Sequence, residues 1–176
     1  KASWVNMAEH FNGTAIPKCA ANYVPLTPTQ FLERAARVHP ERIAVIHGDR
    51  RVTYGDFYVR CRRLASAIQQ QGIARGTAVS VMLSNTPEHL ECLHGVPMAG
   101  AVLNPLNYRL DARNIAFILR HSEAKLLITD TEFSSTVADA LAQLKPEERP
   151  VVIDVDDELA ELRGKKLGSL SYEAFM

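Results

Sequence analysis

Residues 78–83 read Ala-Val-Ser-Val-Met-Leu, and this stretch carries the clearest indication of the fold. Val79, Val81 and Leu83 are apolar, and the residues between them are small or apolar as well. A strand with no polar side is typical of a parallel sheet, because helices cover both faces of such a sheet. The stretch therefore predicts a central strand in an α/β domain.

Other short apolar runs flank this strand in the sequence and alternate with segments of helical periodicity. The expected strands are residues 43–46, 101–103, 126–129 and 151–155, and residues 51–53 can pair back on the first of them across the turn His47-Gly48-Asp49. Buried strands that alternate with helices are the pattern of a sheet wound in both directions. The predicted fold class is α/β, with a doubly wound, mostly parallel sheet and helices on both faces.

Capping residues and glycines mark the helices between these strands. Helices are expected to begin after Thr27, Thr53, Thr86 and Asp111 and to end near His39, Gly72 and Gly100, with Pro97 kinking or shortening the third. The residues expected to face the core are Phe31, Leu32, Ala35, Ala36 and Val38 in the first helix, Phe57, Cys61, Leu64, Ala65 and Ile68 in the second, Leu90, Leu93 and Met98 in the third, Ile115, Ile118 and Leu119 in the fourth, and Phe133, Val137, Leu141 and Leu144 in a fifth. We expect residues 1–25 to be an irregular lead-in arm and residues 26–176 to form the domain.

The composition is that of an ordinary globular domain, with 47% apolar and 23% charged residues. Twenty Lys and Arg balance 20 Asp and Glu, so no net charge attracts the chain to nucleic acid or to an anionic membrane. No apolar run reaches the length of a membrane span. We therefore expect no nucleic-acid partner and no membrane span.

Residue patterns that carry common reaction centres are missing from the sequence. Neither a Gly-x-x-x-x-Gly-Lys-Ser/Thr loop nor a Gly-x-Gly-x-x-Gly turn after a strand is present. Cys19, Cys61 and Cys92 include no Cys-x-x-Cys pair, which favours buried or half-buried free thiols in a reducing cytoplasm over disulfides or a zinc site. His89 and His94 lie five residues apart, a spacing that does not share a helix face well. The residues alone disclose no catalytic centre.

A cluster of acidic residues begins at the end of the last expected strand. Its members are Asp154, Asp156, Asp157, Glu158 and Glu161. Their spacing resembles the opening of a calcium loop, but Leu159 occupies the position where that loop needs glycine. A solvated acidic stretch is the favoured interpretation, an Asp-x-Asp metal clasp stays open as the alternative, and no metal-ligating residue is assigned.

Three arginines crowd the second expected helix. Arg60, Arg62 and Arg63 are not interleaved with aromatic residues, and the chain has no net charge. An exposed basic face is therefore favoured over a nucleic-acid site.

Two longer stretches resemble a known enzyme family. Residues 52–57, Val-Thr-Tyr-Gly-Asp-Phe, followed by Arg-Arg-Leu-Ala at residues 62–65, resemble the first conserved block of the AMP-forming acyl- and aryl-CoA synthetases. Residues 96–107, Val-Pro-Met-Ala-Gly-Ala-Val-Leu-Asn-Pro-Leu-Asn, resemble the second block, and the similarity continues through residues 109–130. This superfamily also includes luciferases and the adenylation domains of peptide synthetases. Residues 22–28 are similar to a subgroup that acts on short or medium acyl chains, including fatty-acid and methylthiopropionate CoA ligases of bacteria and peroxisomal acyl-activating enzymes of plants.

The resemblance implies the N-terminal α/β subdomain of an adenylate-forming ligase. Such an enzyme activates a small-molecule carboxylate with ATP and Mg²⁺ to acyl-AMP and pyrophosphate, and the thiol of CoA then displaces AMP. The implied cofactors are ATP, Mg²⁺ and CoA. A cytoplasmic location is expected, and a peroxisomal location and a homodimer are compatible with the family.

The resemblance also places the catalytic groups of the family beyond Met176. These groups are a Ser/Thr/Gly-rich phosphate loop ending in Pro-Lys-Gly, a Tyr/Thr-Glu segment near adenine and metal, an aspartate on the ribose and a lysine of the C-terminal domain. Residues 169–176 stop shortly before the expected phosphate loop. The chain is therefore expected to be a fragment that is inactive by itself, with no catalytic, cofactor-binding or metal-binding residue to assign.

The residues that do match the family are interpreted as scaffold. Residues 131–135 lack the arginines by which some relatives meet the CoA nucleotide, which makes a CoA contact there doubtful. Turn, cap and packing roles are expected for Tyr54, Asn104, Pro105 and Asn107. Two alternatives stay open: a non-catalytic α/β binding or interaction module of the same fold, and an adenylating enzyme that loads a carrier protein instead of CoA.

Overall fold

The computed structural model describes residues 18–176, and most of the expected lead-in arm, residues 1–17, lies outside the described part. A parallel sheet organises the described residues, with the strand order β4-β3-β5-β6-β7. Its strands are β3 (Ala78–Met82), β4 (Val102–Pro105), β5 (Leu126–Asp130), β6 (Val151–Val155) and β7 (Leu170–Ser171). The stretch at residues 78–83 is thus an inner strand, as the sequence predicts.

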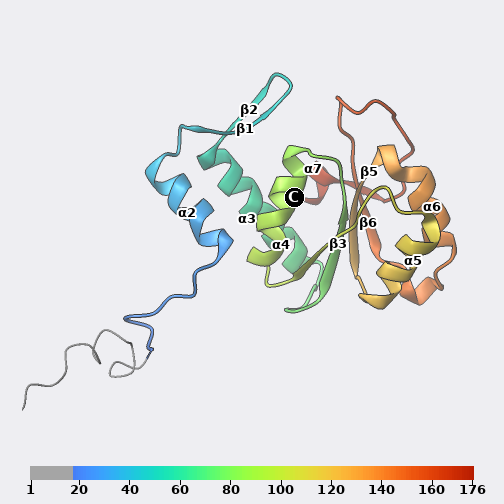
Figure 1. Cartoon of the computed structure of the whole chain (residues 1–176), viewed down its shortest axis with the longest axis horizontal. Coiled ribbons are helices and arrows are strands. Elements are labelled where there is room, and N and C mark those ends of the chain that lie inside the picture. The colour runs from blue at the N-terminus through green and yellow to red at the C-terminus, as the bar shows by residue number, and fades with distance from the viewer. Residues whose placement is uncertain (1–17) are drawn as a thin grey trace, which may run out of the picture.

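The chain winds along this sheet in both directions. From β3 it passes through α4 (Pro87–Met98) to β4 on one side, and then returns through α5 (Ala112–His121) to β5 on the other side of β3. α6 (Ser134–Ala142) continues to β6. Because crossovers between parallel strands are right-handed, the reversal places α4 on one face and α5 and α6 on the other. Figure 1 shows these two layers with the sheet between them, which confirms the doubly wound α/β fold.

Side chains of each inner strand alternate between the two layers. Val79 and Val81 of β3 pack with α4 and with α3 (Tyr54–Gln70), whereas Met82 packs with α5 and α6. Leu126 and Leu127 of β5 divide in the same way. This alternation explains why the inner strands are mostly apolar on both sides; the buried polar exceptions are Ser80, Thr129, Asp130 and Asp154.

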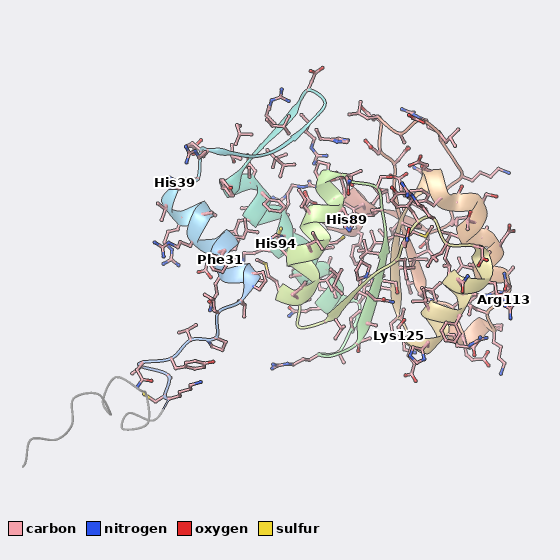
Figure 2. All side chains as sticks on the ribbon, in the orientation of Figure 1. Phe31, His39, His89, His94, Arg113 and Lys125 are labelled. Carbon is pink, nitrogen blue, oxygen red and sulfur yellow. The ribbon has the colours of Figure 1, made fainter. Side chains whose placement is uncertain are left out.

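The segments before β3 form a smaller cluster beside the sheet. α2 (Pro28–Val38) and an antiparallel hairpin of β1 (Ile43–His47) and β2 (Arg50–Thr53) pack against α3. Of the expected apolar stripe of α2, Leu32 is buried, but Phe31 and Val38 are exposed, and Figure 2 shows Phe31 on this helix. The expectation for these two residues is wrong because an edge helix is covered only along the narrow line where it meets its neighbours.

The helix caps follow the expected pattern with one exception. Thr53, Thr86 and Asp111 accept hydrogen bonds from the backbone N–H groups of Asp56, His89 and Asn114. Thr27 makes no such bond, and its Oγ1 lies 3.0 Å from Oγ1 of Thr29. Helix α4 ends at Met98, one residue after Pro97, in agreement with a helix shortened by proline. The remaining elements are the 3₁₀ turns η1 (Thr131–Phe133) and η2 (Pro146–Glu148) and the last helix α7 (Tyr172–Phe175).

The apolar spacing of α4 predicts the wrong face. Leu90 and Leu93 are about 40% exposed, whereas Glu88, Glu91 and Cys92 are buried. Cys92, Gly95, Val96 and Ala99 form the stripe that meets α3 and the sheet. The two larger leucines lie outside the core because small residues are needed where α3 and α4 approach closely.

Candidate functional site

Ligands of open α/β sheets bind outside the carboxyl ends of strands where the winding reverses, here between β3 and β5. Polar side chains follow both strands at this point, but they bond to one another. Ser84 donates from Oγ to Oε2 of Glu132 at 3.2 Å, and His89 donates from Nδ1 to the backbone oxygen of Ser84 at 3.1 Å. Figure 2 places His89 on α4 beside this edge. The polar groups at this end of the sheet are therefore engaged in hydrogen bonds within the fold.

Asp130, the last residue of β5, is fully buried at this edge. Its Oδ1 accepts a hydrogen bond from the backbone N–H of Glu132 at 2.9 Å, but Oδ2 has no hydrogen-bond partner among the described residues. Burial raises the pKa of Asp130 to about 6; the carboxylates of Asp157, Glu132 and Asp156 add to the rise, and the backbone hydrogen bond opposes it. Part of the Asp130 population is thus protonated near neutral pH.

Asp154 of the acidic cluster has a structural role, contrary to the interpretation of the cluster as a solvated stretch. Its side chain is buried and accepts hydrogen bonds from the backbone N–H groups of Leu167 at 3.0 Å and Gly168 at 2.8 Å. A Cβ atom on Gly168 would clash with the backbone oxygen of Val152. The loop between β6 and β7 is therefore laid directly against β6. Asp156 and Glu158 are exposed, in line with the solvated interpretation.

A cleft of about 460 Å³ opens between the β1–β2 hairpin, this loop and α7. His47 Nε2 lies 3.0 Å from Oδ1 of Asp157, and Arg50 donates to Oε1 of Glu88 at 2.6 Å, so both basic side chains of the cleft are paired. Acidic side chains outnumber the basic ones in its lining. Such a cleft repels the phosphates of a nucleotide. Within residues 18–176, no three His, Cys, Asp or Glu side chains are grouped so that they could hold a metal ion.

Arg60 connects three elements and is not part of an exposed basic face. It donates from Nε to Oε1 of Glu91 at 2.5 Å and from Nη2 to Oε2 at 3.2 Å. From Nη1 and Nη2 it also donates to Glu173 of α7, at 3.1 and 2.5 Å. Tyr172 adds a hydrogen bond from its hydroxyl to Oε2 of Glu91 at 3.0 Å. The expected exposure does hold for Arg62 and Arg63. We call Arg60, Glu91, Tyr172 and Glu173 the Arg60 network.

Burial and pairing with Arg60 shift the pKa values of the acidic groups in the Arg60 network. Burial raises the pKa of Glu91, whose side chain has no exposed surface, although the hydrogen bonds and charge of Arg60 oppose the rise. The hydrogen bonds from Arg60 lower the pKa of Glu173, which is largely exposed. Burial raises the pKa of Tyr172, so its hydroxyl remains a hydrogen-bond donor. Each side chain of the network is hydrogen-bonded to another member, so none of the four is an unpaired acid or base that could act on a substrate.

The thiols provide no nucleophile in the core. Cys61 and Cys92 are free and buried, as expected, and burial raises the pKa of both, so they stay protonated. Cys19 is also free but exposed, contrary to the expected burial, because the residues around it are themselves exposed.

The matched scaffold residues make contacts within the fold. Asn104 donates from its amide to Oγ of Ser80 at 2.9 Å and to Oγ of Ser122 at 3.2 Å, which ties β3 and β4 to the end of α5. Asn107 accepts a hydrogen bond from the backbone N–H of Arg109 at 3.0 Å in the turn after β4. The sequence patterns do not identify Glu91 and Arg60 as partners. The stripe of small residues on α4 is the available signal, since it places Glu88 and Glu91 on the buried face.

No helix among residues 18–176 is both long and apolar enough to cross a membrane.

Comparison with known proteins assigns the fold to a family. Residues 32–173 match the family model described as AMP-binding enzyme. The chain is 44% identical over 170 residues to the acetate–CoA ligase CCL3 of Humulus lupulus, covering 92% of this chain and 30% of the relative. It is 41% identical over 170 residues to the peroxisomal acetate/butyrate–CoA ligase AAE7 of Arabidopsis thaliana, with the same coverage of 92% and 30%. The solved N-terminal domain of FACL13 from Mycobacterium tuberculosis superimposes with a TM-score of 0.63 at 30% identity, over 73% of this chain and 33% of that one. The chain thus spans about 30% of the length of these two curated relatives.

Proposed function

The chain belongs to the AMP-binding enzyme family, and on this premise we propose that residues 26–176 are the N-terminal α/β subdomain of an acid–CoA ligase. The observation that carries the proposal is the similarity to CoA ligases along most of the chain, at 41–44% identity. Both matched family blocks lie in the β1–β2 hairpin, α3, α4 and β4, which form one continuous packed unit.

The proposed substrate is a short- or medium-chain carboxylate. Its carboxylate oxygen attacks the α-phosphorus of ATP, the bond to the β-phosphate breaks, and pyrophosphate leaves as acyl-AMP is formed. The thiol of CoA then displaces AMP to give the acyl-CoA thioester. The names of two relatives, which specify acetate and acetate or butyrate, support this substrate class.

Residues 18–176 do not fit the phosphates of ATP, and no three of their His, Cys, Asp or Glu side chains are grouped so that they could hold Mg²⁺. The cleft at the carboxyl edge is acidic, and the donors near the winding reversal are used within the fold. A triphosphate needs backbone N–H groups and cations around it. We therefore derive no catalytic step from these residues and propose that the groups for ATP, Mg²⁺ and CoA lie beyond Met176. The role of this subdomain is to support that part of the enzyme.

The proposed partners are the carboxylate, ATP and CoA, and a homodimer is compatible with the same family. We propose a cytoplasmic location, with the peroxisome as the alternative that the name of the Arabidopsis relative suggests. Sedimentation of the full-length protein decides between monomer and dimer. A fluorescent fusion that leaves both ends of the full-length chain intact decides the location.

The test of the proposed function is ATP–pyrophosphate exchange by the chain together with the sequence that continues it in its gene. We expect exchange that depends on acetate or butyrate and on Mg²⁺, and thioester formation when CoA is added. Benzoate serves as the aromatic comparison, since benzoate–CoA ligases are also among the relatives. Exchange without any thioester would favour a carrier protein as acceptor. Absence of exchange with every carboxylate would overturn the proposal.

The isolated 176-residue chain should show no exchange above background. The polar groups at the winding reversal bond within the fold and the neighbouring cleft is acidic, so the described residues offer no cationic site for the phosphates there. The control is the extended chain at equal concentration. Carboxylate-dependent exchange by residues 1–176 alone would contradict the assignment of the nucleotide groups to the segment beyond Met176.

A further inference from the structure

The guanidinium of Arg60 holds two carboxylates at the same time, on two different helices. The edge formed by Nε and Nη2 faces Glu91 of α4, and the edge formed by Nη1 and Nη2 faces Glu173 of α7. A planar guanidinium can make both forked contacts, whereas a lysine ammonium is a point donor that cannot reproduce them. The structure therefore requires arginine at this position for two-sided contact.

The two halves of this contact differ in their surroundings. The Glu91 side chain has no exposed surface, whereas the Glu173 side chain is 65% exposed. The Glu91 half lies one helical turn from a tight contact of α3 and α4, where a Cβ atom on Gly95 would lie 2.7 Å from Cδ2 of Leu64. The buried carboxylate of Glu91 thus fixes the orientation of the Arg60 guanidinium. As a result, Nη1 and Nη2 point toward α7, the segment after β7.

The last described segment of the chain, α7, begins directly after β7. Strand β7 pairs with β6 by only two residues, so the sheet alone holds this segment weakly. Tyr172 and Phe175 are buried in the layer of α3 and α4, and Tyr172 donates to the same carboxylate that Arg60 holds. The position of the chain at Met176 therefore depends on side-chain contacts: the apolar burial of Phe175 and the Arg60 network.

We infer that Arg60 is a positioning residue of the ligase: it docks α7 on α3 and α4 and so sets the direction of the segment that continues from Met176. This inference rests on the proposed function, in which that segment contributes to adenylation. A misplaced catalytic segment lowers the rate of the chemical step even when the substituted residue is remote, because the reacting groups lose their alignment. Both edges of the Arg60 guanidinium are occupied by Glu91 and Glu173, so we expect the apparent affinity for the carboxylate substrate to remain.

The experiment uses the full-length ligase and three variants. Glu173→Gln removes the charge on the exposed side and leaves the Arg60–Glu91 pair intact, so the buried charge stays compensated. Arg60→Lys keeps a positive charge beside Glu91 but loses the two-sided contact. The matched control is Glu33→Gln, which breaks the exposed pair of Arg37 and Glu33 on α2.

Two measurements are made on each variant. We expect deuterium uptake of residues 170–176 to rise in Glu173→Gln and more in Arg60→Lys, while uptake of β5 stays at the wild-type level. We expect kcat of ATP–pyrophosphate exchange to fall about tenfold in Arg60→Lys and less in Glu173→Gln, with KM for the carboxylate unchanged. Glu33→Gln should leave both measurements unchanged.

Wild-type uptake at residues 170–176 in both Glu173→Gln and Arg60→Lys would overturn the docking role. A fall of kcat no larger than in Glu33→Gln, or a rise of KM alone, would overturn the positioning role. If the wild-type protein itself shows no exchange with any carboxylate, the proposed function fails, and the uptake of residues 170–176 then decides the docking role by itself.

Discussion

The two helical layers of the domain are held to the same sheet by different forces. The layer of α5 and α6 packs through apolar side chains such as Ile115, Leu119 and Val137, and the polar link on this side, from Asn104 to Ser80, is uncharged. The layer of α3 and α4 buries apolar side chains too, but it also encloses the carboxylate of Glu91 with Arg60 as its partner. The first layer combines hydrophobic burial with uncharged hydrogen bonds, and the second combines hydrophobic burial with charge pairing.

Apolar spacing predicts the buried face of a helix correctly in one of these layers and wrongly in the other. In α5 the residues at helical spacing, Ile115 and Leu119, are fully buried, as the sequence predicts. In α4 the leucines at helical spacing are exposed and the glutamates are inside. A carboxylate is tolerated in a core only when a partner compensates its loss of hydration. The pattern of one helix cannot reveal a partner that another helix supplies.

The largest expected effect comes from breaking the buried pair. Arg60→Met leaves Glu91 buried without a counter-charge and should lower the free energy of unfolding by about 3–5 kcal/mol, measured by urea titration at pH 7. Arg60→Met combined with Glu91→Leu should recover part of the loss, because the unpaired charge of Glu91 is gone, although the buried hydroxyl of Tyr172 loses its acceptor. Arg63→Met, an exposed arginine of the same helix, is the control and should change stability by less than about 0.5 kcal/mol. Equal effects of Arg60→Met and Arg63→Met would remove the distinction between the two layers.

A smaller effect is expected at the close approach of α3 and α4. Gly95→Ala introduces a Cβ atom 2.7 Å from Cδ2 of Leu64 and 3.0 Å from the backbone oxygen of Cys61. Overpacking of this kind should cost about 1–3 kcal/mol, even though alanine is the better helix former. Leu64→Ala in the same chain should relieve the clash, so the double variant should lose less than the sum of the two single changes. A stabilising effect of Gly95→Ala would mean that the helices are free to separate.

Asp130 lies at the end of β5, between the two helical layers, and its ionisation should make the stability of the fold depend on pH. Its pKa is raised from 3.8 to about 6 in the folded state, so its contribution to stability is present below pH 4 and is lost as the pH rises through about 6. Asp130→Asn should therefore stabilise the chain relative to wild type at pH 7 by about 1–2 kcal/mol, with the gain disappearing near pH 4. Urea titrations at pH 4, 5, 6 and 7 measure this trend. A gain that is the same at all four values would show that ionisation of Asp130 is not its cause.

The smallest effect is expected on the outer side of α4. Leu90→Ser and Leu93→Ser should each cost about 1 kcal/mol, because both side chains are about 40% exposed. Leu119→Ser on α5 provides the matched comparison and should cost more than about 2 kcal/mol, since that leucine is fully buried. Thermal unfolding of the three variants ranks them. Similar losses for Leu93→Ser and Leu119→Ser would place the outer leucines in the core after all.

Much of the fold could be predicted from local signals. The inner strands, the caps at Thr53, Thr86 and Asp111 and the hairpin at residues 43–53 follow from apolar runs and from short-range hydrogen bonding. The site could be predicted only in outline. The acidic neighbours of Asp154 in the sequence indicate a solvated side chain, whereas the backbone of residues 167–168 satisfies it within the fold.

The doubly wound α/β class and the family membership can be recognised in the amino-acid sequence, because both depend on patterns of neighbouring residues. Only the tertiary structure decided which face of α4 is buried and what holds α7 in place. The reason is distance along the chain: Arg60 is 31 residues from Glu91 and 113 residues from Glu173. The compensation of a buried charge is a property of groups that folding brings together, and no single segment contains it.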